Sequence, residues 1–403
     1  MLEKEYVELA RKVLVESIKF PTVLGEAYEQ IVDYYSDVLS SIGAHVTVHR
    51  VADEYVRKVV PSNMAPDKPR FILLARIGRG RPVIQFNGHY DVVAPGDGWS
   101  TNPFEPLERE GRIYGRGATD MKGGIASVVA AVASLARREP NVTVEVALVP
   151  DEEIGGAAGT GYLVDVLGSR PDFVIIAEPS GIDNVYIGHR GNVWALVHVL
   201  GAQAHGSSPW LGDNAFERML ALASYMISRY KGILEGKASK YSYEDANASR
   251  PSATFGGLLK SAGSINVVPG RVTFSIDRRL IVEESVEEVK REIVALVEEA
   301  SRATGARAEV EFVGESEPAL TSPSSPFVEA LSKAIEGVIG RKPSLTICTG
   351  GLDLRYYARR GIPSVAYGPG EVGLAHKANE YVRLDDVVKA SEAYVKFVEA
   401  LGG

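Results

Sequence analysis

The chain has 403 residues, of which 45% are hydrophobic and 24% charged, and its formal net charge is −8. This balance is typical of a folded globular protein with two or three domains. The negative charge argues against nucleic-acid binding, and no apolar run is long enough to span a membrane. A single cysteine, Cys348, excludes an internal disulfide, and the N-terminal residues lack the apolar block of a signal peptide. We therefore expect a cytoplasmic enzyme.

Two amphipathic helices are predicted at the start of the chain, over residues 2–18 and 31–42. Pro21 ends the first helix and Gly43 caps the second. Short apolar runs of strand length follow at 71–77, 83–87, 142–149 and 173–177, with a helix over 125–135 between the second and third runs. The last run is apolar on both faces, as in a buried parallel strand. This alternation predicts an α/β fold with a mostly parallel sheet and helices on both faces.

The pattern changes near Gly191, where an inserted α+β domain of β-α-β-β-α-β order is predicted. Its strands are expected at 194–200, 253–259, 272–281 and 308–313, and its helices at 215–230 and after the capping box of Ser285 and Glu288. Beyond a Ser/Pro-rich connector, strands are expected at 345–348 and 364–367 and a helix at 385–401. The sequence thus predicts one domain formed by residues 1–190 and 317–403, interrupted by a domain of residues 191–316.

Histidine and acidic residues follow several strands of the predicted sheet or precede its helices. They are His89 and Asp91 in FNGHYDVV, Asp120 in GRGATDMKGG, Glu152 and Glu153 in PDEEIGG, Glu178 in AEPS, and His376 in AHKANE. Open α/β sheets bind ligands at the carboxyl ends of their strands. Each motif alone could be a surface loop or a helix cap, but five together predict a metal site. Three carboxylates and a hydroxide would neutralise two divalent cations, and a spare carboxylate could serve as general base.

Local geometry supports two details of this site. Residues i and i+2 of an extended chain lie on the same side, so Asp91 can lie behind the His89 imidazole and fix its tautomer. Glu152 and Glu153 can reach one site only if the chain turns after the strand, and Gly155 and Gly156 permit such a turn.

The five motifs, in this order, resemble the metallopeptidase family of acetylornithine deacetylase, succinyl-diaminopimelate desuccinylase, aminoacylase and carboxypeptidase G. The similarity runs from about His89 to the C-terminus. It implies two divalent metal ions per chain; ligands without thiolate suit zinc, with cobalt or manganese as alternatives. It also implies a cis peptide after Asp120. By the resemblance, His89 and Glu178 bind one metal, Glu153 and His376 bind the other, Asp120 bridges them, Asp91 orients His89, and Glu152 is the general base.

The same resemblance implies that the inserted domain acts as a lid over the site and also mediates formation of a homodimer. His205, in GAQAHGSSP, matches the histidine that crosses the dimer interface to polarise the substrate carbonyl. Asn266, in INVVPG, matches a residue that contacts substrate. Arg279, or its neighbour Arg278, matches the arginine that pairs with the substrate carboxylate. The segment TGGLDLRY at 349–356 resembles a substrate-binding loop.

These observations predict a metallohydrolase of linear amide or peptide bonds, specifically an N-acyl-amino-acid deacylase with no nucleic-acid or membrane partner. A dipeptidase or carboxypeptidase that acts on short peptides is the alternative within the same family. A non-catalytic binding protein is disfavoured because every ligand and the base are present. A nucleotide-dependent enzyme is disfavoured because the phosphate-binding motif G-x-x-x-x-G-K-[ST] is absent. The acyl group and the amino acid stay open.

Overall fold

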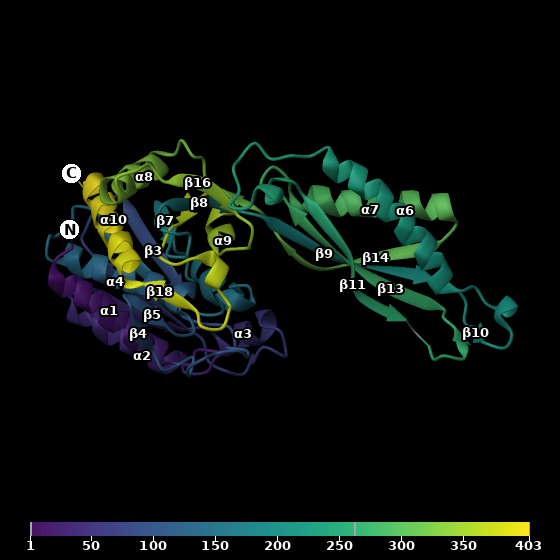
Figure 1. The fold of residues 1–403 in the computed structure, drawn as a ribbon, viewed down its shortest axis with the longest axis horizontal. Coiled ribbons are helices and arrows are strands. Elements are labelled where there is room, and N and C mark those ends of the chain that lie inside the picture. The colour runs from purple at the N-terminus through teal and green to yellow at the C-terminus, as the bar shows by residue number, and fades with distance from the viewer. Residues whose placement is uncertain (1, 262, 403) are drawn as a thin grey trace. The chain divides into compact units, whose positions relative to one another are not determined.

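The computed structural model describes residues 2–261 and 263–402. The chain forms two compact units (Figure 1). The first unit comprises Met1–Gly188, Thr321–Thr346 and Leu352–Gly403, and the inserted unit comprises His189–Leu320 and Ile347–Gly351. Among the residues described, no helix is both long and apolar enough to cross a membrane.

The first unit is built on a mixed sheet in which neighbouring strands follow the order β1-β2-β6-β3-β7-β17-β8. The strands are β1 (His45–Arg50), β2 (Phe71–Ile77), β3 (Val83–His89), β6 (Thr143–Val149), β7 (Phe173–Ile176), β8 (Asn184–His189) and β17 (Ser364–Ala366). β6, β3, β7 and β17 run parallel to one another. β1, β2 and β8 pair in antiparallel fashion. The prediction of a mostly parallel sheet is therefore correct only for the central strands. An apolar run of residues indicates that a strand is buried but does not indicate its direction.

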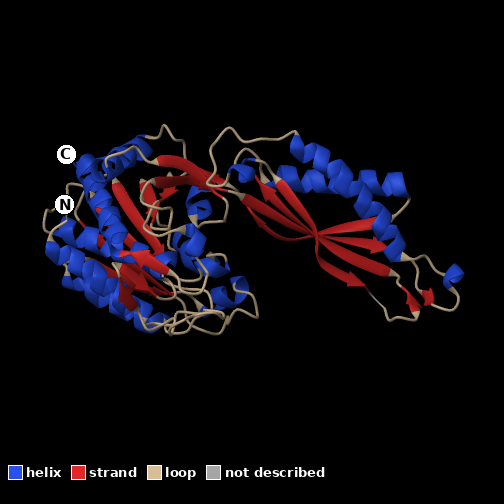
Figure 2. Cartoon of the chain, in the orientation of Figure 1, coloured by secondary structure: helices blue, strands red, loops and turns tan. Residues whose placement is uncertain are grey.

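Helices cover both faces of this sheet (blue in Figure 2). They are α1 (Lys4–Ile18), α2 (Tyr28–Ser41), α3 (Asp53–Val59), α4 (Gly123–Ala136), α5 (Tyr162–Asp165), α8 (Pro326–Ile339), α9 (Leu354–Ala358) and α10 (Leu384–Gly402). On one face, α4 packs against α1 and α10, and Phe86 contacts Tyr394 with ring centroids 4.8 Å apart. On the other face, α3 and α5 share an apolar cluster with β2 and β6, and Tyr357 of α9 accepts a hydrogen bond from Asn87.

A small sheet with strand order β18-β5-β4 was not predicted. Its strands are β4 (Leu107–Arg109), β5 (Arg112–Tyr114) and β18 (Tyr381–Arg383). The strands are three residues long and half exposed, so they carry no apolar period that sequence reasoning could detect. Their pairing places the segment before Asp120 beside the segment after His376.

The inserted unit has a four-stranded antiparallel sheet of order β11-β13-β9-β14 and two long helices. In chain order its larger elements are β9 (Gly191–Leu200), α6 (Ala215–Glu235), β11 (Ser252–Ser261), β13 (Arg271–Leu280), α7 (Val286–Thr304) and β14 (Arg307–Ser316). Apolar side chains of both helices pack on one face of the sheet. Both hydrogen bonds of the predicted capping box, between Ser285 and Glu288, are present at the start of α7.

The remaining elements are short. They are β10 (Ala204–His205), β12 (Val267–Val268), β15 (Ala319–Leu320), β16 (Ser344–Cys348), and the helical turns η1 (Ala118–Lys122), η2 (Glu152–Ile154), η3 (Ala157–Gly161), η4 (Pro209–Leu211), η5 (Ala246–Ser249) and η6 (Val372–Leu374).

Candidate metal centre

Three neighbouring parallel strands deliver polar side chains to one edge of the main sheet. His89 is the last residue of β3, and it pairs with Val149, the last residue of β6. Glu152 and Glu153 follow β6, and Glu178 follows β7. Because parallel strands end at the same edge, residues from distant parts of the sequence meet there.

A tight turn after β6 makes room for both glutamates. Glu152 and Glu153 begin the turn η2, and Asp151, Gly155 and Gly156 around it have left-handed backbone angles, with φ of 64°, 105° and 66°. The turn that is needed after this strand for Glu152 and Glu153 to reach one site is therefore present. The Asp91 carboxylate accepts hydrogen bonds from the backbone N–H groups of Glu152 (3.2 Å) and Glu153 (3.1 Å), which ties the turn to the end of β3.

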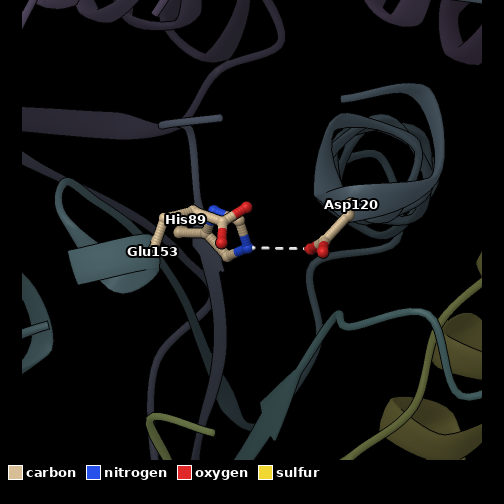
Figure 3. Close-up of side chains that lie close together, drawn as sticks. All are labelled: His89, Asp120 and Glu153. Carbon is tan, nitrogen blue, oxygen red and sulfur yellow. Dashed lines mark hydrogen bonds and ion pairs between the residues drawn. The ribbon is translucent and has the colours of Figure 1, made fainter. Parts of the chain in front are cut away.

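Asp120 lies between two histidines. It belongs to η1, just before α4, and its peptide bond to Met121 is cis, as the family resemblance implied. One carboxylate oxygen, Oδ1, is 3.2 Å from Nε2 of His89, and the other, Oδ2, is 3.2 Å from Nε2 of His376. Figure 3 shows the His89 ring and the Asp120 carboxylate pointing toward each other, with Glu153 beside the ring.

Each histidine also faces one glutamate. Glu178 Oε1 is 3.5 Å from His89 Nε2, and Glu153 Oε2 is 3.0 Å from His376 Nε2. The potential ligand atoms of His89, Asp120 and Glu153 lie within 4.8 Å of one another, and so do those of His89, Glu152 and Glu178. Imidazole nitrogens and carboxylate oxygens at these separations fit divalent metal ions such as zinc.

The second nitrogen of His89 faces Asp91. Its Nδ1 is 3.0 Å from the main-chain carbonyl oxygen of Asp91 and 3.5 Å from carboxylate oxygen Oδ1. A proton on Nδ1 donates to the carbonyl oxygen and leaves the Nε2 lone pair directed at Asp120 and Glu178. The carbonyl is thus the nearer partner, while the Asp91 carboxylate holds the glutamate turn.

Burial and neighbouring charges shift the pKa values of the groups at this site. Burial, reinforced by the nearby Asp120 carboxylate, raises the pKa of Glu153 to about 7. Burial also raises the pKa of Glu178 well above its ordinary value, despite the opposing effect of His89. Hydrogen bonds to Asp120 and Glu153 raise the pKa of His376 to about 10. The raised pKa values show that these groups favour bound protons, and the positive charge of a bound cation would be favourable at the same position.

The inserted unit holds the other predicted residues at two separate places. His205 and Asn266 are neighbours, because the Gly206 N–H donates to the Asn266 carbonyl at 2.7 Å and β10 pairs with β12. Arg279 lies toward the opposite end of β13, where it pairs with Asn192. Within one chain, the structure does not bring Arg279 to His205 and Asn266.

The two neighbouring arginines of β13 differ in their surroundings. Arg278 is fully buried, and its guanidinium pairs with Glu284 at 2.5 Å. Arg279 is partly exposed and pairs with Asp277 at 2.9 Å. Arg279 is therefore the more accessible of the two arginines.

Sequence reasoning missed three buried charged residues near the site. Arg116 and Glu380 form a buried ion pair, and Asp353 is buried beside the η2 turn, where a Cβ atom on Gly156 would lie 2.2 Å from its Oδ1. All three lie inside motifs of the site, GRGATD, AHKANE and TGGLDLRY. The available signal was the presence of a further charged residue inside a motif already singled out.

Comparison with known proteins places the chain among metal-dependent hydrolases. Residues 85–400 match the family described as Peptidase family M20/M25/M40. A succinyl-diaminopimelate desuccinylase of Gluconobacter oxydans is 33% identical over 348 residues, which cover 83% of this chain and 86% of that protein. The five motifs from His89 to Glu380 all lie within the matched residues.

Solved structures share the fold over nearly the whole chain. An M20 family metallo-carboxypeptidase from Sulfolobus solfataricus has a TM-score of 0.72 at 21% identity, covering 97% of this chain and 98% of that one. The YXEP protein of Bacillus subtilis, described as a dinuclear metal binding peptidase, has a TM-score of 0.71 at 15% identity, covering 99% of each chain.

Proposed function

We propose a specific activity for this chain, which belongs to peptidase family M20/M25/M40. It is a metal-dependent N-acyl-amino-acid deacylase. Membership of the family makes it a hydrolase that acts on amide bonds. The observation that carries the proposed mechanism is the position of Asp120, whose two carboxylate oxygens each face one histidine at 3.2 Å. The substrate class is supported by the relatives named succinyl-diaminopimelate desuccinylase.

Two divalent metal ions would be held by the ligand set described above. His89 and Glu178 would hold one ion, Glu153 and His376 the other, and Asp120 would bind both. When bound, such ions supply Lewis acidity, which lowers the pKa of a water molecule and polarises an amide carbonyl. Zinc suits these ligands, and cobalt or manganese would also fit.

Glu152 is the carboxylate that this assignment leaves over. It lies with His89 and Glu178 at the same edge of the sheet, so its carboxylate can reach a water molecule held there. We assign it the role of general base: its oxygen takes a proton from the attacking water and returns it to the leaving amine nitrogen. The Asp91 carboxylate fixes the backbone of Glu152 and so helps to position this base.

The inserted unit would complete the substrate site from a second copy of the chain. The strand from Arg271 to Arg279 spans about 27 Å at about 3.4 Å per residue, and His205 lies beyond its Arg271 end. One small substrate cannot contact both Arg279 and His205 of a single unit. A homodimer resolves this, with Arg279 holding the substrate carboxylate and with His205 and Asn266 supplied by the partner.

The outer face of α6 supports association through the inserted unit. Phe216, Leu220 and Ile227 recur at helical spacing and are exposed, whereas Met219 and Met226 on the opposite face are buried. An exposed apolar stripe of this kind marks a surface that another protein covers. We propose that a second copy of the chain covers it.

A dipeptidase or carboxypeptidase is the second candidate, since a metallo-carboxypeptidase shares this fold. The same metal ligands and base would serve a peptide bond. The two candidates differ only in what the substrate pocket accepts, so a substrate panel separates them.

The test is hydrolysis of N-acetyl amino acids, N-succinyl amino acids and dipeptides by chelator-stripped protein, with and without added zinc, cobalt or manganese. We expect no release of free amine without metal and restored release with it, with an N-acyl amino acid as the best substrate. A dipeptide as best substrate would favour the second candidate. Turnover that survives complete metal removal would contradict both.

A further inference from the structure

A buried ion pair lies next to the candidate metal centre without belonging to it. Arg116 and Glu380 are both fully buried, and Nη1 of the arginine is 2.5 Å from Oε2 of the glutamate. Removing two charges from water costs more than their attraction returns unless further hydrogen bonds satisfy them, so a buried pair is weak evidence of a stabilising role. What these two side chains hold in place is therefore informative.

The Glu380 carboxylate holds the backbone that carries Asp120. It accepts hydrogen bonds from the N–H groups of Gly117 (3.2 Å), Thr119 (2.7 Å) and Asp120 itself (2.9 Å). These three donors precede α4 and point into a fully buried carboxylate. The position of the Asp120 backbone thus depends directly on Glu380.

The Arg116 guanidinium holds the backbone that carries His376. Its Nη2 donates to the His376 carbonyl oxygen at 3.3 Å, and its Nη1 donates to the Lys377 carbonyl oxygen at 3.5 Å. Nη2 also donates to the Pro95 carbonyl oxygen at 3.0 Å. The ion pair consequently fastens two segments that are far apart in sequence, each of which supplies one side chain to the contact between Asp120 Oδ2 and His376 Nε2.

The two candidate metal positions do not depend equally on this pair. His89 ends a central strand and Glu178 follows one, and both side chains are buried. The His376 side chain is 53% exposed and sits on a turn after η6. Of the two histidines, His376 therefore has the less secure position without help from Arg116 and Glu380.

We propose that Arg116 and Glu380 are positioning residues for the metal position formed by Asp120, Glu153 and His376. They hold Asp120 and His376 at a separation at which both can bind one ion. Breaking the pair should weaken that position more than the position at His89 and Glu178, because the two positions share Asp120 but only the first depends on His376. This inference rests on the proposed function, since it presupposes two metal ions per chain.

The test is a calorimetric titration of chelator-stripped protein with zinc. The wild-type chain should bind two equivalents. Glu380→Gln should lower the second affinity by about 10- to 100-fold, the usual effect of losing a partner that orients a metal ligand, and should lower the first affinity by a smaller factor through the shared ligand Asp120. Hydrolysis by the variant should recover as zinc is raised, which a general loss of structure would not allow. Arg116→Lys keeps the charge but loses the planar fork, and it should act in the same direction if Glu380→Gln does not fold.

A matched control breaks an ion pair of a buried arginine in the inserted unit, whereas the predicted metal ligands lie in the first unit. Glu284 pairs with the fully buried Arg278 in the inserted unit, so Glu284→Gln should leave both zinc affinities unchanged. The inference would be overturned if the second zinc affinity were unchanged in both Glu380→Gln and Arg116→Lys, or if both affinities fell equally. Either outcome would leave the two-metal proposal standing. A wild-type chain that binds fewer than two zinc ions would overturn the two-metal proposal, and this inference with it.

Discussion

At the scale of single residues, Glu152 and Glu153 are neighbours in the chain with different surroundings. Glu153 lies 3.0 Å from His376, whereas Glu152 groups with His89 and Glu178. The sharp turn after β6 brings to one site two carboxylates that regular strand geometry would have sent to opposite faces. The proposed function gives these chemically identical side chains two roles, Glu153 as a metal ligand and Glu152 as the base.

Glu152→Gln tests this division of roles. The substitution keeps the size of the side chain but removes its ability to accept a proton, so two zinc ions should still bind while kcat falls by about 10²- to 10⁴-fold. Zinc content by mass spectrometry and steady-state kinetics would check both parts. Glu287→Gln, on the exposed surface of α7, is the control and should change neither. Normal turnover by Glu152→Gln would remove Glu152 from the role of base.

Among the elements, the η2 turn positions Glu152 and Glu153, and its shape depends on the glycines that follow it. Gly156 has a φ of 66°, and a Cβ atom there would lie 2.2 Å from Asp353 Oδ1. Gly168 has a similar φ of 72° but no atom within 4 Å of its Cβ position. The two glycines thus share the backbone requirement and differ in the space around them.

Substituting alanine at each position separates the two effects. Gly168→Ala should lower the free energy of unfolding by about 1–2 kcal/mol, the cost of a left-handed backbone with a Cβ atom. Gly156→Ala should lose a further 1–3 kcal/mol, roughly, because it must displace a buried carboxylate. It should also lower kcat by moving Glu152. Urea unfolding curves would measure the difference in unfolding free energy. Equal losses of unfolding free energy in the two variants would mean that Asp353 moves aside without lowering stability.

Most elements of the fold could be predicted because their apolar periodicity is local. The helices α1, α2 and α4 and the strands β2, β3, β6 and β7 form where that periodicity predicts them. The direction of the outer strands and the small sheet of β4, β5 and β18 could not be predicted. Both depend on which segments meet in space, and short exposed strands carry no apolar pattern.

At the scale of the whole molecule, the positions of Arg279 and His205 require a second copy if both residues contact one substrate. The inserted unit places them near opposite ends of its sheet. Complementation between two inactive variants tests this arrangement. His205→Ala and Glu152→Gln should each be inactive alone.

Mixing these two variants under conditions that allow subunit exchange should restore activity. In a mixed dimer, one site has Glu152 from its own chain and His205 from the partner, and is therefore intact. Release of amine by the mixture, measured against each variant alone, would check the prediction. If His205 acts within its own chain, every site in the mixture lacks one essential group and no activity returns.

The reaction class of this protein could be predicted without a structure. The residue types in five motifs, and their placement at strand ends, were sufficient to predict a metal-dependent hydrolase and the family to which it belongs. This was possible because ligand chemistry and apolar periodicity are properties of short segments. Three features became visible only in the folded chain: which oxygen of Asp120 faces which histidine, the exposure of Arg279 beside the buried Arg278, and the ion pair of Arg116 with Glu380, 264 positions away in sequence. Such contacts depend on how distant segments pack together, and no local pattern records them.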